Sequence, residues 1–111
     1  MIRIDLEKLA EFKEIKHVDY ILIHKNITIL IEETSRAKSD DIKKIESTIQ
    51  ALKQGLLSNY LTKHGLNLGS HIISIIHTAR RPSTMEYKMM HSVKIPIYIV
   101  ACKRELNQKT K

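Results

Sequence analysis

Two runs of β-branched residues, separated by two polar residues, constrain the fold of this chain more than any other feature. Val18–His24 and Ile27–Thr34 are each predicted to be a strand, and Lys25-Asn26 has the length of a two-residue hairpin turn. In the register that such a turn imposes, Asp19 lies opposite Glu32. The two side chains then point to the same face of the sheet, with Cβ atoms about 5 Å apart.

Two like charges at this separation repel each other, so the pair of Asp19 and Glu32 requires a compensating partner. A divalent cation is the simplest one, because Mg²⁺ is commonly held by one or two carboxylates together with phosphate oxygens. We therefore expect Asp19 and Glu32 to hold Mg²⁺ or Mn²⁺. A three-residue turn would instead place Ile31 or Glu33 opposite Asp19. In the two-residue register Glu33 points to the other face and is not expected to be a ligand.

Length and composition limit the class of protein. A chain of 111 residues is expected to form one α/β domain, residues 1–111. It has no apolar run of about 18 residues and no export signal, which predicts a cytoplasmic protein that does not enter a membrane. Its one cysteine, Cys102, excludes an internal disulfide and a cysteine metal cluster. The net charge of +7 favours polyanionic partners, nucleic acid before an anionic membrane.

Helical patterns flank the predicted hairpin. A first helix is expected over residues 5–16, with Leu6, Leu9 and Phe12 on one side. Ser39 is the expected N-cap of a second helix, in which acidic residues of the first turn complement the helix dipole. This helix should run for about 20 to 25 residues and end near His64-Gly65. Its apolar stripe consists of Ile42, Ile45, Ile49, Leu52 and Leu56.

The second half of the chain adds two strands and a short helix. His71–His77 and Ile95–Ala101 are predicted strands, and Ser83 with Glu86 forms a capping box that opens a helix ending near His91. Hairpin strands are antiparallel, whereas strands joined through helices tend to be parallel. The expected fold is therefore a small mixed β-sheet flanked by helices. A candidate surface for self-association on the short helix consists of Met85, Tyr87, Met89 and Met90.

The segment Val18–Arg36 resembles the core of the PD-(D/E)xK nucleases, most closely the archaeal Holliday junction resolvases. In that family an Asp opens one strand of a hairpin, and a Glu-x-Lys closes the next strand before a helix. Asp19 matches the Asp, and Glu32 matches the Glu. The resemblance implies a restriction-endonuclease-like core, a Mg²⁺ or Mn²⁺ cofactor, DNA as the nucleic acid and a homodimer. It also implies an acidic residue on the first helix, for which the candidates are Glu7, Glu11 and Glu14.

The chain departs from this family at two places. The family's lysine should stand at position 34, where this chain has Thr34; its hydroxyl could orient a water but carries no positive charge. Some relatives supply the lysine from the following helix, and the candidates here are Lys38, Lys43 and Lys44, of which Lys44 lies one turn inside the helix. The alternative for all three is a solvated surface. The resolvases also have a strand between the first helix and the Asp-bearing strand, for which the predicted order of elements leaves no room.

Basic residues outside the hairpin are candidates for binding nucleic acid. Arg80 and Arg81 precede the predicted third helix, whose N-terminal N–H groups are a place where a phosphate can bind. Together with Lys38 they form the expected nucleic-acid contacts. Their alternative interpretation is a solvated loop. The histidine spacing does not suggest a metal site, and three glycines are too few for a Gly-rich phosphate loop.

Three functions are consistent with these features. The first is a metal-dependent DNA endonuclease that cleaves phosphodiesters in structured or branched DNA, with Asp19, Glu32, Thr34 and Lys44 in the catalytic site. The second is a catalytically inactive protein of the nuclease fold that binds nucleic acid or a protein partner. The third is a small scaffold protein with incidental charge, whose DNA affinity would vanish at moderate salt.

Overall fold

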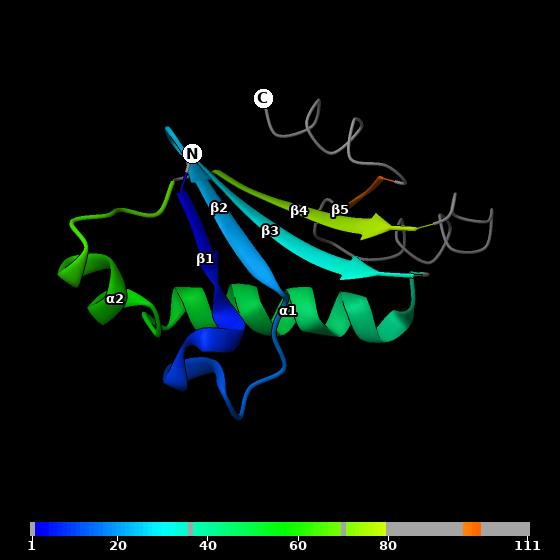
Figure 1. Cartoon of the computed structure of the whole chain (residues 1–111), viewed down its shortest axis with the longest axis horizontal. Helices are drawn as coiled ribbons and strands as arrows, with labels where there is room; N and C mark the ends of the chain where they lie inside the picture. Colours follow the sequence, from blue (N-terminus) through cyan, green and yellow to red (C-terminus); the bar gives the residue numbers. More distant parts are fainter. Residues whose placement is uncertain (1, 36, 70, 80–96, 101–111) are drawn as a thin grey trace.

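The described part of the chain is built on one five-stranded sheet. The computed structural model describes residues 2–35, 37–69, 71–79 and 97–100. The strands are β1 (Ile2–Asp5), β2 (Tyr20–His24), β3 (Ile27–Thr34), β4 (His71–Thr78) and β5 (Ile97–Val100), and they lie side by side in chain order (Figure 1). The β1–β2 and β2–β3 pairs are antiparallel, and the β3–β4 and β4–β5 pairs are parallel. The prediction of a small mixed α/β sheet is confirmed.

The central hairpin has the predicted two-residue register. Tyr20 pairs with Ile31, and His24 pairs with Ile27 across the turn. Lys25 adopts a left-handed backbone with φ of 53°, as tight hairpin turns require of one or both central residues. The strand β2 begins at Tyr20 rather than at Val18, so Asp19 immediately precedes it.

The prediction of a helix over residues 5–16 is wrong. This segment begins in β1 and continues as two 3₁₀ turns, η1 (Leu6–Lys8) and η2 (Ala10–Phe12). Ile4 pairs with Ile21 of β2, and this ladder takes up backbone hydrogen bonds that a helix would have formed internally. Leu6 and Phe12 are both fully buried. The apolar residues that suggested a helical stripe are therefore core residues of an irregular segment.

The prediction of a single long helix is also wrong, because the chain forms two helices in its place. They are α1 (Ser39–Lys53) and α2 (Ser58–Lys63). Gly55 lies between them with φ of +81°, a left-handed conformation that ends helices. The N-cap of α1 is Lys38, and Ser39 is the first helical residue. The cap is closed by Asp41, whose Oδ2 accepts a hydrogen bond of 2.8 Å from the backbone N–H of Lys38.

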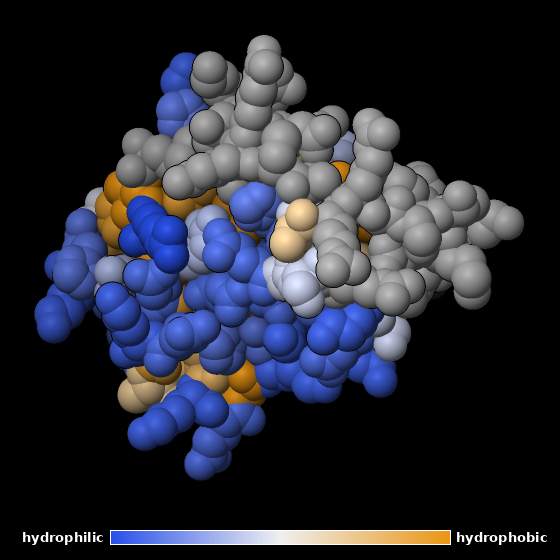
Figure 2. Space-filling view, turned by 45° about the vertical axis from the view of Figure 1, so that its right-hand side comes forward, coloured by the Kyte–Doolittle hydropathy of each residue, from blue (hydrophilic) through white to orange (hydrophobic). Residues whose placement is uncertain are grey.

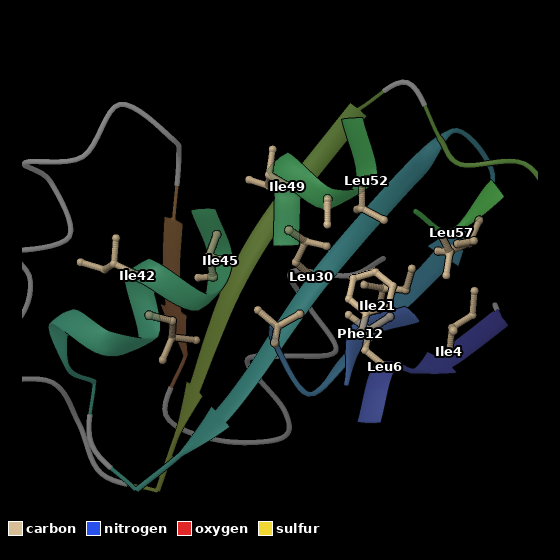
Figure 3. Packing of buried hydrophobic residues seen from close by; sticks show 14 of the residues in the cluster. Ile4, Leu6, Phe12, Ile21, Leu30, Ile42, Ile45, Ile49, Leu52 and Leu57 are labelled. Carbon is tan, nitrogen blue, oxygen red and sulfur yellow. The ribbon is translucent and has the colours of Figure 1, made fainter. Parts of the chain in front are cut away.

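The helix α1 covers one face of the sheet. Its predicted apolar stripe belongs to one buried cluster with residues of β1, β2, β3 and β4, and Figure 3 shows Ile42, Ile45, Ile49 and Leu52 along the helix. The opposite face of the sheet has a second buried cluster. Its fully or almost fully buried members are Tyr20, Ile29, Ile31, Ile75 and Val100.

Several predictions fall outside the described residues. They are the helix over residues 83–91 with its methionine surface, Arg80, Arg81 and Cys102. The last strand is described over Ile97–Val100, within its predicted range. Figure 2 shows mainly hydrophilic side chains over the coloured part of one face, with smaller hydrophobic areas. Within the described ranges, none of the helices has the length and apolar character needed to cross a membrane.

Candidate functional site

Asp19 and Glu32 meet at the end of the β2–β3 hairpin that lies away from its turn. Asp19 directly precedes β2, and the pairing of Tyr20 with Ile31 places it next to Glu32. Its negative charge acts on Glu32 as a neighbouring like charge. Asp19 is held in turn by the backbone N–H of Glu33, which donates to Oδ2 at 2.8 Å. The structure therefore brings the two predicted carboxylates together.

Glu32 is a buried carboxylate with a cationic partner. Only 1% of the residue is exposed, and Nζ of Lys44 lies 2.6 Å from its Oε2. Burial raises the pKa of Glu32 to about 7; the charge of Asp19 acts in the same direction, and the hydrogen bond from Lys44 opposes both. Its second oxygen, Oε1, is buried and has no hydrogen-bond partner among the described residues.

The path of α1 explains why Lys44 reaches Glu32. The chain leaves the end of β3 and turns back into α1, whose first turns pass beneath that end of the sheet (Figure 1). Lys44 lies in the second turn, one position before the fully buried Ile45, and 32% of its side chain is exposed. Of the three candidate lysines, Lys44 is the one placed at Glu32, whereas Lys38 and Lys43 are exposed.

Thr34 lies on the same side of β3 as Glu32, because side chains two positions apart share a face of a strand. It is half-buried and pairs with Thr78 of β4. The site thus has a hydroxyl where the resemblance places a lysine, and a lysine that comes from the helix.

The charges at this site bear directly on metal binding. Lys44 supplies part of the compensation that the sequence left to a divalent cation. Within the described residues, no group of three or more His, Cys, Asp or Glu is arranged to hold a metal ion. Two carboxylates can still hold Mg²⁺ when water and phosphate oxygens complete the shell, and the unpartnered Oε1 of Glu32 fits this role. The residues present are compatible with one such cation at Asp19 and Glu32.

Asp19 also lines a cleft of about 470 Å³, a volume typical of ligand sites. Arg3 and Asp5 also line this cleft. The guanidinium of Arg3 lies 3.8 Å above the ring of Tyr20, and its Nε donates a hydrogen bond of 2.8 Å to Asp5. Of the three glutamates considered for the first helix, Glu7 lines the cleft, while Glu11 and Glu14 are exposed on the surrounding turns. The remaining lining residues are Lys8, Tyr20 and Glu33.

The side chain of Glu33 points to the other face of the sheet, as the two-residue register predicts. Its Oε1 accepts a hydrogen bond of 3.2 Å from the hydroxyl of Tyr20 and lies 3.8 Å from Nδ1 of His77. Burial raises the pKa of Tyr20 to about 12, and the negative charge of Glu33 adds to this shift. The backbone of Glu33 nevertheless serves the site through Asp19, a contact that no residue pattern could have indicated because it uses the main chain.

The expected nucleic-acid contacts remain predictions. Lys38 is exposed at the N-cap of α1. Arg80 and Arg81 are outside the described residues.

Comparison with protein-family models, with curated proteins and with solved structures found no match for this chain. Its function must therefore be inferred from the geometry of this site.

Proposed function

We propose that this protein is a metal-dependent DNA endonuclease of the PD-(D/E)xK type in which Lys44 takes the part of the family's lysine. One observation carries the proposal: Nζ of Lys44 lies 2.6 Å from Glu32, whose carboxyl neighbours that of Asp19. Two acids and one lysine from three different segments thus converge at one end of a sheet. This combination is the one that the resemblance requires, with the lysine supplied by the helix.

The order of the elements supports the same proposal. The resemblance implies a hairpin with the Asp and the Glu, then a helix, then a further strand. The chain has this order in β2, β3, α1 and β4, with β4 parallel to β3. A further strand, β1, precedes the Asp-bearing strand and pairs with it, although two 3₁₀ turns rather than a helix lie beside it. We therefore include a restriction-endonuclease-like core in the proposal.

The residues of the site suit phosphodiester hydrolysis. Asp19 and Glu32 would hold Mg²⁺ or Mn²⁺, which when bound polarises the scissile phosphate and lowers the pKa of an attacking water. The ammonium of Lys44 is fixed by Glu32 and carries a positive charge into a half-buried site, where it stabilises negative charge that develops on the phosphate. Thr34, farther along the same face of β3, offers a hydroxyl that can orient a water.

A second candidate is an inactive nuclease-fold protein that binds nucleic acid or a protein partner. The observation that favours it is the same ion pair, because Lys44 already neutralises Glu32 without a metal. In such a protein the pair would be structural, and the basic surface would bind DNA without cutting it. The net charge of +7 is compatible with both candidates.

Cleavage assays separate the two candidates. Labelled single-stranded, duplex and four-way-junction DNA are incubated with the protein and Mg²⁺ or Mn²⁺, beside the variants Asp19→Ala and Glu46→Gln. Glu46 is an exposed carboxylate on α1, outside the carboxylate pair, and its variant controls for loss of one negative charge. Cleavage that is lost in Asp19→Ala and kept in Glu46→Gln supports the nuclease. DNA binding without cleavage above the Asp19→Ala background on every substrate supports the inactive protein.

A further inference from the structure

We propose that Thr48 is a positioning residue that aligns Asp19 and Lys44 with each other. Thr48 lies in the third turn of α1 and is fully buried among apolar side chains. Its hydroxyl makes two hydrogen bonds. It accepts one from the backbone N–H of Val18 at 3.0 Å, and it donates one to the carbonyl of Lys44 at 2.7 Å.

These two bonds join the two halves of the candidate site. Val18 directly precedes Asp19, and Lys44 carries the ammonium that contacts Glu32. The segment at Val18 lies before the start of β2, so its N–H falls outside the ladder that β2 forms with β1 and β3. A buried N–H in this place needs another acceptor, and Thr48 provides it. One hydroxyl therefore links the carboxylate segment to the helical turn that presents the cation.

The position of Asp19 depends on the hydrogen bond at Val18 together with two contacts of Asp19 itself. The carbonyl of Asp19 accepts a hydrogen bond of 3.2 Å from the N–H of Leu6, and its Oδ2 accepts one from the N–H of Glu33. The backbone is thus held on its carbonyl side by Leu6 and on its amide side, one residue earlier, through Thr48. Without the second restraint, the segment before Asp19 keeps the buried side chain of Val18 and the contact of its carbonyl with Nδ1 of His17, and we expect the side chain of Asp19 to shift relative to the N–H of Glu33.

A simpler interpretation of Thr48 is possible. Threonines inside helices commonly donate to the carbonyl four residues earlier, and that bond alone says nothing about a site. The acceptor role toward Val18, a residue 30 positions away, is what distinguishes Thr48. Under the simpler interpretation, removal of the hydroxyl would leave the environment of Asp19 unchanged. The consequence for catalysis rests on the proposed function, whereas the positioning of Asp19 can be measured without it.

The test uses the backbone amide of Glu33 as a reporter, because this N–H donates directly to Asp19. Its hydrogen exchange is measured by NMR in the full chain and normalised to other amides of the β2–β3 ladder. Thr48→Val keeps the shape of the side chain and removes the hydroxyl, and Thr48→Ser keeps the hydroxyl and removes the methyl group. Thr48→Ala leaves room for a water beside Val18 and replaces Thr48→Val if that variant does not fold. The affinity for Mn²⁺ is measured on the same samples by calorimetry.

Thr28 offers a matched control. It is also fully buried, and its hydroxyl also accepts a backbone N–H, that of Gly69 at 2.8 Å, near the turn end of β3. Thr28→Val therefore removes the same kind of hydrogen bond at the turn end of the hairpin, away from the carboxylate pair.

The expected result is that the Glu33 amide exchanges about tenfold faster in Thr48→Val, relative to the ladder, and remains near the wild-type rate in Thr48→Ser and Thr28→Val. Mn²⁺ affinity should fall in Thr48→Val alone. Equal rates in Thr48→Val and Thr28→Val would overturn the inference, as would a Thr48→Ser protein that behaves like Thr48→Val. If the wild-type protein binds no Mn²⁺, the metal site of the proposed function fails, while the Glu33 amide still decides the role of Thr48.

Discussion

Nζ of Lys44 lies 2.6 Å from Oε2 of Glu32, although the two residues stand on different elements and 12 positions apart. Glu32 is buried, so the ion pair satisfies a carboxylate that would otherwise lack charge compensation. It also leaves the second oxygen of Glu32 unpartnered within the described residues, on a group whose neighbour is Asp19.

Replacement of Lys44 tests whether it stands in for the family's lysine. We expect Lys44→Met to reduce the rate of DNA cleavage by about 100-fold or more, because the positive charge at the phosphate is lost. Lys43→Met is the matched control, since Lys43 is the exposed neighbour on the same helix. Introduction of Thr34→Lys into the Lys44→Met protein should restore part of the activity. Equal activity of Lys44→Met and Lys43→Met would remove Lys44 from the proposed mechanism.

The stability of the protein should decrease as the pH rises toward neutrality. Burial raises the pKa of Glu32 from 4.5 to about 7, so between these values the folded state keeps a proton that the unfolded state has released. A state that binds more protons is favoured at low pH, and the free energy of unfolding therefore falls as pH rises through this window. The pKa of Asp5 is lowered from 3.8 by Arg3, so its opposite effect lies below the window.

This pH dependence can be measured by urea denaturation at intervals from pH 4.5 to 8. Glu32→Gln should flatten the slope over the window, and Glu46→Gln should retain it. A wild-type protein whose stability rises from pH 5 to 7 would show that Lys44 keeps Glu32 ionised in spite of its burial.

Gly69 should resist substitution because it lies against the backbone of the hairpin turn. A Cβ at this position would come within 2.3 Å of the carbonyl carbon of Asn26 and 2.4 Å of the backbone nitrogen of Ile27. Such contacts cannot be relieved by a change of rotamer, so we expect Gly69→Ala to lower the free energy of unfolding by about 3 kcal/mol or more. Gly65→Ala meets no atom within 4 Å, and its φ of +64° should cost about 1 kcal/mol. Chemical denaturation of both variants would test this order, and a reversed order would contradict it.

The start of α1 depends on a carboxylate rather than on the serine at its first position. Asp41 is 2% exposed, and its Oδ2 accepts the N–H of Lys38. We expect Asp41→Ala to lower the free energy of unfolding by about 1 kcal/mol, the usual loss of a helix cap. Ser39→Ala should have little effect, because no side-chain bond closes the cap from that position. Thermal unfolding of the two variants would distinguish them. A larger loss of stability in Ser39→Ala than in Asp41→Ala would show that Ser39 caps the helix.

The hairpin was predictable because its determinants are local. Alternating and β-branched residues set the two strands, and a two-residue turn leaves one register in which Tyr20 meets Ile31. That register was enough to place Asp19 beside Glu32 before any tertiary contact was known. The apolar stripe of α1 was equally readable, since helical spacing alone aligns Ile42, Ile45 and Ile49 on one face.

The prediction of a helix over residues 5–16 fails because the local pattern of this segment and its tertiary packing differ. Leu6 and Phe12 have helix-like spacing, but the chain gains more from pairing Ile4 with Ile21 along β2 than from a short isolated helix. The break at Gly55 had a local signal, the glycine itself, which the continuing run of leucines obscured. Both errors concern segments whose conformation depends on what they pack against.

The sequence by itself determined the hairpin, its register, the neighbouring carboxylates and the amphipathic helix that follows, because each depends on residues close together in the chain. Only the tertiary structure selected Lys44 from three lysines, linked Val18 to Thr48, and turned the N–H of Glu33 toward Asp19. These contacts depend on the direction in which α1 crosses the sheet, which residue spacing does not encode. The reason is geometric: a helix can expose any of several lysines, and packing of its apolar face decides which one reaches a buried acid.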